Sequence, residues 1–248
     1  MKRLPILMYH SISSSTEHME LCITPSVFQA QMKMLHHMGY RGVSLLEGLT
    51  IFESQTVRDA KVIVLTFDDG YEDNLHHALP ILHELDYTAT CFFVAEKLGS
   101  ESFDIWSNGT HRLMDSNQLK EWSRMGMEVG SHTLTHPNLT KIDKAHAKHE
   151  IADSKTILSD LTGCPVSSFA YPYGVYNNQI CQYVGETGYG QAVTVKPRSA
   201  YHFDHQLKLP RIGIVPRHAP WLLRTKIKTP YVDLKVLVEE AFRSCVRQ

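Results

Sequence analysis

The sequence predicts an α/β fold in which helices cover a parallel sheet. Short apolar segments alternate with longer segments of helical period along the chain, which is the pattern of repeated β-α units. The run Val62–Phe67 is apolar apart from one threonine, as expected for a strand buried on both faces. The length of 248 residues exceeds a typical domain of roughly 150 residues but suits one α/β barrel, so we expect a single domain over residues 1–248.

Eight segments are predicted to be strands, because each is a short apolar run bounded by turn residues or polar residues. The last of them contains a lone arginine, Arg211, in otherwise apolar sequence. In chain order the predicted strands are Leu4–Tyr9, Gly42–Leu45, Val62–Phe67, Ala89–Val94, Met127–Ser131, Ser168–Tyr171, Gln191–Val195 and Leu207–Ile214.

Six segments are predicted to be helices. The first is the best marked: Thr24 suits the N-cap, Pro25 the first helical position, and Gly39 the stop. Apolar residues recur between them at spacings of three and four. The other predicted helices are Glu72–Leu85, Ser116–Met125, Lys141–Leu161 after a Thr140 cap, Asn178–Thr187 and Val232–Val246.

Composition excludes several classes of protein. Lys and Arg number 25 against 26 Asp and Glu, without a basic block, so we expect no nucleic-acid partner. No window approaches the roughly 18 apolar residues of a membrane span, so we expect no integral membrane segment. The five cysteines are widely spaced and no signal peptide is visible, which favours a cytoplasmic location. The sequence does not indicate an oligomeric state.

Two adjacent carboxylates, Asp68 and Asp69, follow the strongest predicted strand and precede Gly70. The carboxyl ends of parallel strands carry the active sites of α/β barrels. Adjacent carboxylates repel each other unless a cation, a proton or a hydrogen bond compensates. The segment therefore indicates a catalytic or metal site, and a plain Asp-Gly turn is the alternative.

Two histidines, His132 and His136, lie four residues apart just after another predicted strand. One helical turn would place both on one face. Two imidazoles with one carboxylate leave coordination positions open, as a catalytic metal site requires. Surface histidines are the alternative. A third segment, Tyr171-Pro172-Tyr173-Gly174, breaks a predicted strand and could direct a main-chain N–H into a site, or could be an ordinary loop.

In this order, the three segments resemble the first three motifs of the polysaccharide deacetylases, the NodB homology domain of carbohydrate esterases. The motifs span residues 66–174, and the flanking strands extend the resemblance over nearly the whole chain. The resemblance implies a distorted (β/α)7-type barrel. It also implies an enzyme that removes N-acetyl groups, or in some members O-acetyl groups, from sugars with a divalent metal, usually zinc.

Position by position, the resemblance assigns roles to the motif residues. Asp69, His132 and His136 would bind the metal, and Asp68 would be the general base. The backbone N–H of Tyr173 would hold the oxyanion of the tetrahedral intermediate. Two histidines and one aspartate also accept nickel, cobalt or iron(II), so zinc is the expected metal but not the sole candidate.

The sequence departs from the commonest family pattern in its general acid. No Leu-x-His triplet follows the third motif, and His218 lies in a proline-rich segment. However, Met8-Tyr9-His10 resembles the N-terminal motif of the poly-N-acetylglucosamine deacetylase branch, in which the motifs are circularly permuted. The first and last strands of a barrel can be neighbours, so His10 is the expected general acid. A rim histidine without a catalytic role is the alternative.

A second departure concerns the arginine that orients the base in the family, because Ala170 occupies its position. A buried guanidinium needs a carboxylate partner. We therefore predict that Arg211 replaces the missing arginine by pairing with Asp68, with a surface-edge arginine as the alternative.

The expected function is metal-dependent removal of N-acetyl groups from an N-acetylglucosamine-type glycan or glycan precursor, with release of acetate. A catalytically silent sugar-binding domain is one alternative. It is disfavoured because sugar binding alone needs no base at Asp68. A purely structural metal is the other, and it would require a fourth protein ligand that the sequence does not offer.

Overall fold

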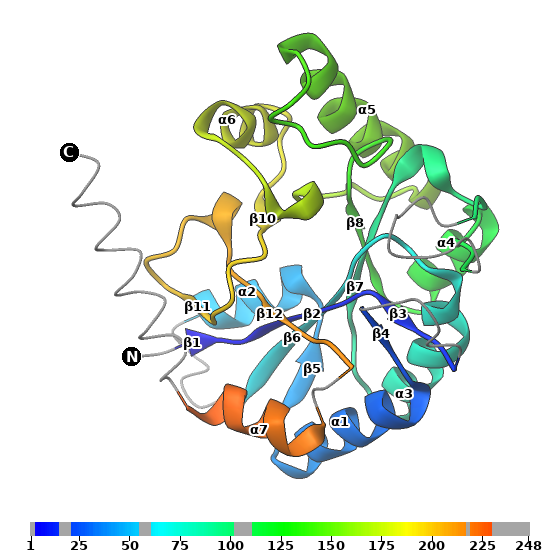
Figure 1. Ribbon diagram of the computed structural model, residues 1–248, viewed down its shortest axis with the longest axis vertical. Coiled ribbons are helices and arrows are strands. Elements are labelled where there is room, and N and C mark those ends of the chain that lie inside the picture. The colour runs from blue at the N-terminus through cyan, green and yellow to red at the C-terminus, as the bar shows by residue number, and fades with distance from the viewer. Residues whose placement is uncertain (1–2, 15–20, 55–60, 102–110, 217–218, 230–248) are drawn as a thin grey trace.

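The structure, a computed structural model, describes residues 3–14, 21–54, 61–101, 111–216 and 219–229. A curled sheet of parallel strands lies at its centre, with helices packed around it (Figure 1). The strands follow the order β10, β9, β8, β7, β6, β2, β12, and β5 pairs with the first half of β6. This is the predicted distorted barrel. The strands are β2 (Ile6–Tyr9), β5 (Arg41–Val43), β6 (Val62–Phe67), β7 (Thr90–Phe93), β8 (Glu128–Ser131), β9 (Ser168–Ala170), β10 (Gln191–Val193) and β12 (Ile212–Gly213).

A seam formed by residues 209–213 joins the two ends of the sheet. At one end of the seam the Leu209 N–H donates to the Ala192 carbonyl oxygen in β10 at 2.9 Å. At the other end Ile212 pairs with Leu7 in β2. The seam therefore brings residues from the last part of the chain against the first strand of the barrel.

The last predicted strand, Leu207–Ile214, is largely wrong. Residues Gln206–Lys208 form a 3-10 turn, and only Ile212–Gly213 forms a strand. Pro210 lies between the two pieces, and proline has no N–H to donate to a strand partner. The remaining predicted strands agree with the structure to within one or two residues at each end.

Two short strand pairs lie outside this sheet. β1 (Arg3–Leu4) pairs antiparallel with β11 (Ala200–Tyr201). β3 (Ser11–Ile12) pairs parallel with β4 (Cys22–Ile23). Because β3 begins two residues after β2 ends, it carries the chain onward from His10 at the carboxyl end of the sheet.

The predicted cap of the first helix is confirmed: the Thr24 side chain accepts from the Val27 N–H, and Pro25 occupies the first turn. The predicted helix Glu72–Leu85 begins with a π-helical turn, Asn74–Ala78. The helices are α1 (Pro25–His37), α2 (Leu45–Glu53), α3 (Leu79–Glu84), α4 (Ser116–Arg124), α5 (Lys144–Thr162), α6 (Asn178–Glu186) and α7 (Pro220–Lys228).

One helix prediction needs correction, one observed helix was not predicted, and one predicted helix lies outside the described residues. α5 is capped by Asp143, whose carboxylate accepts from two N–H groups of the first turn, whereas Thr140 bonds to Asn138. α2 is absent from the prediction: Ser44 caps it directly after β5, because a serine oxygen can accept from the Glu47 N–H. The predicted helix Val232–Val246 lies outside the described residues.

The core lies between the sheet and the helices. All six residues of β6 are buried, as predicted for a strand covered on both faces. On the helix side, the Trp122 ring of α4 packs edge-on against Phe67 with centroids 6.0 Å apart. Among the described residues, no helix combines the length and apolar character that crossing a membrane would need.

Candidate active site

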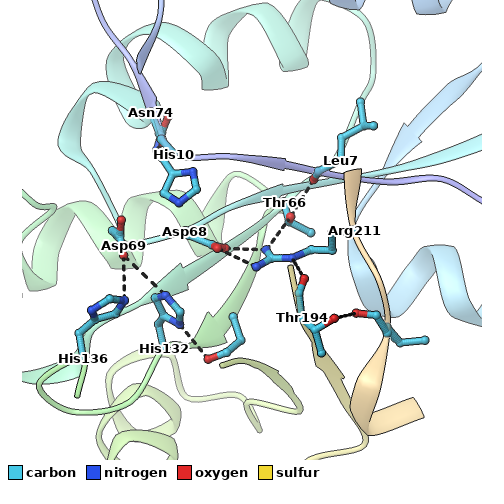
Figure 2. Close-up of polar contacts among 12 residues, drawn as sticks. Leu7, His10, Thr66, Asp68, Asp69, Asn74, His132, His136, Thr194 and Arg211 are labelled. Atoms are coloured by element: carbon cyan, nitrogen blue, oxygen red, sulfur yellow. Dashed lines mark hydrogen bonds and ion pairs between the residues drawn. The ribbon is translucent and has the colours of Figure 1, made fainter. Parts of the chain in front are cut away.

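Polar side chains gather at the carboxyl ends of the parallel strands (Figure 2). Tyr9 of β2 lies opposite Phe67 of β6, and the Asp68 N–H donates to the Tyr9 carbonyl oxygen at 3.0 Å. His10 and Asp68 therefore directly follow two neighbouring strands, at the same edge of the sheet. The predicted proximity of the N-terminal histidine to the aspartate pair is present, and it follows from the parallel register of β2 and β6.

Arg211 forms a bidentate ion pair with Asp68. Its two terminal nitrogens donate to the two carboxylate oxygens, each at 2.7 Å. The guanidinium also donates to the Thr66 hydroxyl at 3.1 Å and to the Thr194 carbonyl oxygen at 3.0 Å. Arg211 is 0% exposed, so the alternative of a surface-edge arginine is wrong. The predicted pairing with Asp68 is present.

This ion pair controls the protonation of Asp68. Burial by itself would raise the pKa of the carboxyl group. The positive charge and hydrogen bonds of Arg211 outweigh burial, and the pKa of Asp68 lies well below its usual value. Asp68 is therefore a buried carboxylate that stays ionised at neutral pH, as a general base must.

Asp69, His132 and His136 form a cluster of three potential metal ligands, with one ligand atom from each residue within 4.8 Å of the others. Asp69 Oδ1 lies 3.6 Å from His132 Nε2 and 3.7 Å from His136 Nε2. His132 Nδ1 lies 2.8 Å from the Ala170 carbonyl oxygen. That contact favours a proton on Nδ1 and leaves Nε2 as the ligand atom that faces Asp69.

The electrostatics of the cluster suit a metal. Burial lowers the pKa of His132 to about 4. Burial, followed by the nearby His132, lowers the pKa of His136 to about 2. Both imidazoles are therefore neutral at physiological pH, and neutral imidazole is the form that binds a metal. Together with one carboxylate they make a donor set that fits zinc and leaves positions open.

The two histidines lie on a loop. The predicted helical turn between them is wrong, because Thr133 and His136 have left-handed φ values of 69° and 64°. The buried carboxylate of Glu150 in α5 accepts from the N–H groups of Leu134 and Thr135, each at 2.9 Å. It also accepts from the Thr135 hydroxyl at 2.6 Å. Glu150 thus holds a strained turn that a β-branched residue would otherwise avoid.

The Tyr171–Gly174 segment turns beside the histidines. Tyr173 has a φ of 58°, and its ring lies against His136 with centroids 4.6 Å apart. Gly174 follows with a φ of 65°, and a Cβ there would lie 2.3 Å from a Val195 methyl. The segment therefore needs a glycine to bring Tyr173 to the rim of the site.

These residues line one cavity of about 170 Å³. Asp68, Asp69, His10 and both cluster histidines border it, together with Tyr173. A larger cavity of about 390 Å³ lies near the amino ends of β8 and β9 and includes none of these groups. The candidate catalytic groups therefore border the smaller of these two cavities, at the carboxyl ends of the strands.

A sequence profile of the family described as polysaccharide deacetylase matches residues 55–192. The chain belongs to the polysaccharide deacetylase family. YxkH of Bacillus subtilis, which is assigned by its name to the polysaccharide deacetylases, is 32% identical over 214 residues, which is 86% of this chain and 72% of YxkH. The poly-β-1,6-N-acetyl-D-glucosamine N-deacetylase of Staphylococcus aureus is 26% identical over 82% of this chain and 71% of its own length.

Solved structures of deacetylases share the fold of this polysaccharide deacetylase. The Streptococcus pyogenes deacetylase PplD, determined in complex with acetate, matches 92% of this chain and 99% of its own with a TM-score of 0.82 and 28% identity. The Bacillus cereus polysaccharide deacetylase BC0361 matches 92% of this chain and 69% of its own with a TM-score of 0.76 and 28% identity. The fold and the deacetylase class thus agree with the sequence-based expectation.

Several groups at the site of this polysaccharide deacetylase have no signal in the sequence. The Thr194 carbonyl and the Thr66 hydroxyl contact Arg211 only because the barrel closes. Glu150 lies on a predicted helix, where an acidic residue is ordinarily a solvated surface group. His218, the second candidate for the general acid, lies outside the described residues.

Proposed function

We propose that this polysaccharide deacetylase removes N-acetyl groups from N-acetylglucosamine-type glycans with a divalent metal held by Asp69, His132 and His136. One observation carries the proposal: the buried, ionised Asp68 borders the same small cavity as the three-residue cluster. A base beside three metal donors is an arrangement suited to metal-assisted hydrolysis. The substrate class follows the name of the Staphylococcus aureus relative, a poly-β-1,6-N-acetyl-D-glucosamine N-deacetylase.

Zinc is the proposed metal, and nickel, cobalt and iron(II) accept the same donors. The cation would polarise the acetyl carbonyl and make a water molecule easier to deprotonate. The chain's own contribution is to keep both histidines neutral by burial and to orient His132 through the Ala170 carbonyl.

Asp68 is proposed to take a proton from the attacking water. The water oxygen would add to the acetyl carbon, the C–N bond would break, and acetate and a free amine would leave. Arg211 keeps Asp68 ionised and fixes both carboxylate oxygens, so the base is oriented before substrate arrives. A substitution at either residue should therefore affect the chemical step.

His10 is proposed to protonate the departing nitrogen. Its ring projects toward Asp68 and Asp69 from the neighbouring strand (Figure 2). Burial lowers the pKa of His10, so its ring is mainly neutral before the reaction. The proton that Asp68 takes from the water would therefore pass to His10 and from there to the departing nitrogen. Tyr173 borders the cavity beside His136, and its backbone N–H is proposed to hold the developing oxyanion.

The test is acetate release from a panel of N-acetylglucosamine oligomers by protein stripped of metal and then reloaded with zinc. We expect release only after reloading, and a loss of roughly 10²- to 10⁴-fold in kcat for His10→Ala. Near-normal acetate release by His10→Ala would show that another group is the general acid. The absence of acetate with any metal, together with sugar binding in a titration, would contradict the proposal and support a silent sugar-binding domain.

A further inference from the structure

We propose that Asp73 and Asn74 are positioning residues that set His10 over the site by holding the backbone of residues 10–12. The inference rests on the proposed function, in which His10 protonates the departing amine. Neither residue borders the catalytic cavity with the reacting groups. Their effect on the reaction is therefore expected to pass through the position of His10.

Two adjacent side chains hold three consecutive residues. The Asn74 side-chain amide donates to the His10 carbonyl oxygen at 2.7 Å. One oxygen of Asp73 accepts from the Ile12 N–H at 3.0 Å, and the other accepts from the Ser11 hydroxyl at 2.5 Å. The backbone that leaves β2 is therefore bound at three points to one short segment.

This attachment bears on the direction of the His10 ring. Its buried Nδ1 has no hydrogen-bond partner among the described residues. His132 differs, because its Nδ1 lies 2.8 Å from the Ala170 carbonyl oxygen. The direction of the His10 ring therefore depends in part on where its backbone is fixed, and Figure 2 shows Asn74 above His10 in the view, on the side away from Asp69.

The hydrogen bonds from Asp73 and Asn74 to residues 10–12, here called the clamp, come from the segment that also carries the base. Asp73 and Asn74 follow Asp69 by four and five residues, and Asn74 begins the π-helical turn. The Glu72 N–H donates to the Arg112 carbonyl oxygen at 2.9 Å, which anchors this segment from the other side. Asn74 is 0% exposed, so water does not compete for its amide. Beyond the register of β2 and β6, one short connection thus ties the backbone at His10 to the segment that follows Asp68 and Asp69.

The experiment is a double-mutant cycle between Asn74→Ala and His10→Ala in the zinc-loaded full chain, measuring kcat and KM for acetate release and the zinc Kd. Glu72→Ala is the matched control, because its carboxylate bonds to Gln118 in α4 and not to residues 10–12. Asp73→Ala and the milder Asp73→Asn are followed by amide hydrogen exchange at Ile12. An amide side chain in place of Asp73 keeps an acceptor for the Ile12 N–H.

We expect Asn74→Ala to lower kcat by roughly 10- to 100-fold, the loss that a displacement near 1 Å can cause. KM and the zinc Kd should stay within about twofold, and in the His10→Ala background the further loss should also be below about twofold. An equal fold-loss in both backgrounds, or an equal loss in Glu72→Ala, would overturn the inference.

Hydrogen exchange separates this inference from the proposed function. If the wild type releases no acetate with any metal, the proposed function fails and exchange alone decides. Faster exchange of the Ile12 amide in Asp73→Ala, restored toward wild type in Asp73→Asn, would support the clamp. Unchanged exchange in Asp73→Ala would overturn it.

Discussion

Arg211 donates hydrogen bonds to both carboxylate oxygens of Asp68, each at 2.7 Å, although the two residues lie 143 positions apart in the sequence. Arg211 lies in the seam that closes the barrel, and Asp68 lies at the end of β6. The motif position that carries an arginine in the commonest family pattern is Ala170 here. A closed sheet lets a residue from a different segment reach the same carboxylate, so the pairing with Asp68 does not require that position.

Replacing Arg211 with methionine should raise the pKa of Asp68, because burial remains and the opposing positive charge is gone. The acidic limb of the pH profile of kcat/KM should therefore move to higher pH. We also expect a loss of about 3–5 kcal/mol in the free energy of unfolding, since a buried charge loses its partner.

Arg198→Met is the matched control for Arg211→Met. Arg198 is also buried and forms a bidentate pair with Asp204, at 2.7 and 2.6 Å, away from the cavity. It should lower stability without moving the acidic limb. An unshifted limb and a near-normal rate in Arg211→Met would contradict the proposed role of Arg211.

Asp68→Asn and His132→Ala should separate the base from the metal ligands. Asp68→Asn should keep the metal and lose roughly 10²- to 10⁴-fold in kcat, because the side chain can no longer accept a proton. His132→Ala should lose both metal and activity. Metal content and acetate release, measured on the same preparations, test both expectations. Full activity in Asp68→Asn would show that Asp68 is not the general base.

Glu150→Ala should weaken zinc binding. Without its carboxylate, the N–H groups of Leu134 and Thr135 lose their acceptor and the strained turn between the histidines can relax. A partner that orients metal ligands is typically worth roughly 10- to 100-fold in metal affinity. A competition titration against a chromogenic chelator measures this. Asp153→Ala, an exposed residue on the same helix, serves as control, and equal affinity in the two variants would reject the expectation.

The metal-free protein should lose stability as the pH falls from about 6.5 toward 4. The ordinary histidine pKa is 6.5, whereas that of folded His132 is about 4. Between pH 6.5 and 4 this histidine is protonated in the unfolded chain but neutral in the folded protein, so acid favours unfolding. The slope contributed by one such histidine is at most about 1.4 kcal/mol per pH unit.

Urea unfolding of metal-free protein at several pH values tests this dependence. His132→Gln should lose less stability per pH unit between these pH values, because one group that is protonated only in the unfolded chain is removed. His76→Gln, on an exposed side chain, should keep the wild-type slope. A wild-type slope in His132→Gln would show that this histidine is not the source of the pH dependence.

Much of the fold could be predicted from local patterns. Val62–Phe67 was predicted with the bounds that the structure has, because a strand buried on both faces is apolar throughout. The first helix was equally clear, since Thr24 and Pro25 act through neighbours in the sequence. The last strand and the start of α5 were missed because single residues, Pro210 and Asp143, decide them.

The sequence by itself determined which side chains could do the chemistry: two adjacent aspartates after a buried strand, two histidines after another, and a histidine at the end of the first. These assignments depend on residue type and on the ends of strands, which are local properties. Only the tertiary structure decided how the groups combine. The contacts of Arg211 with Thr66 and Thr194, the left-handed turn held by Glu150 and the attachment of His10 to Asn74 join distant segments. Such contacts arise when the sheet closes and buries polar groups that must then find partners, and no local pattern records which partners those will be.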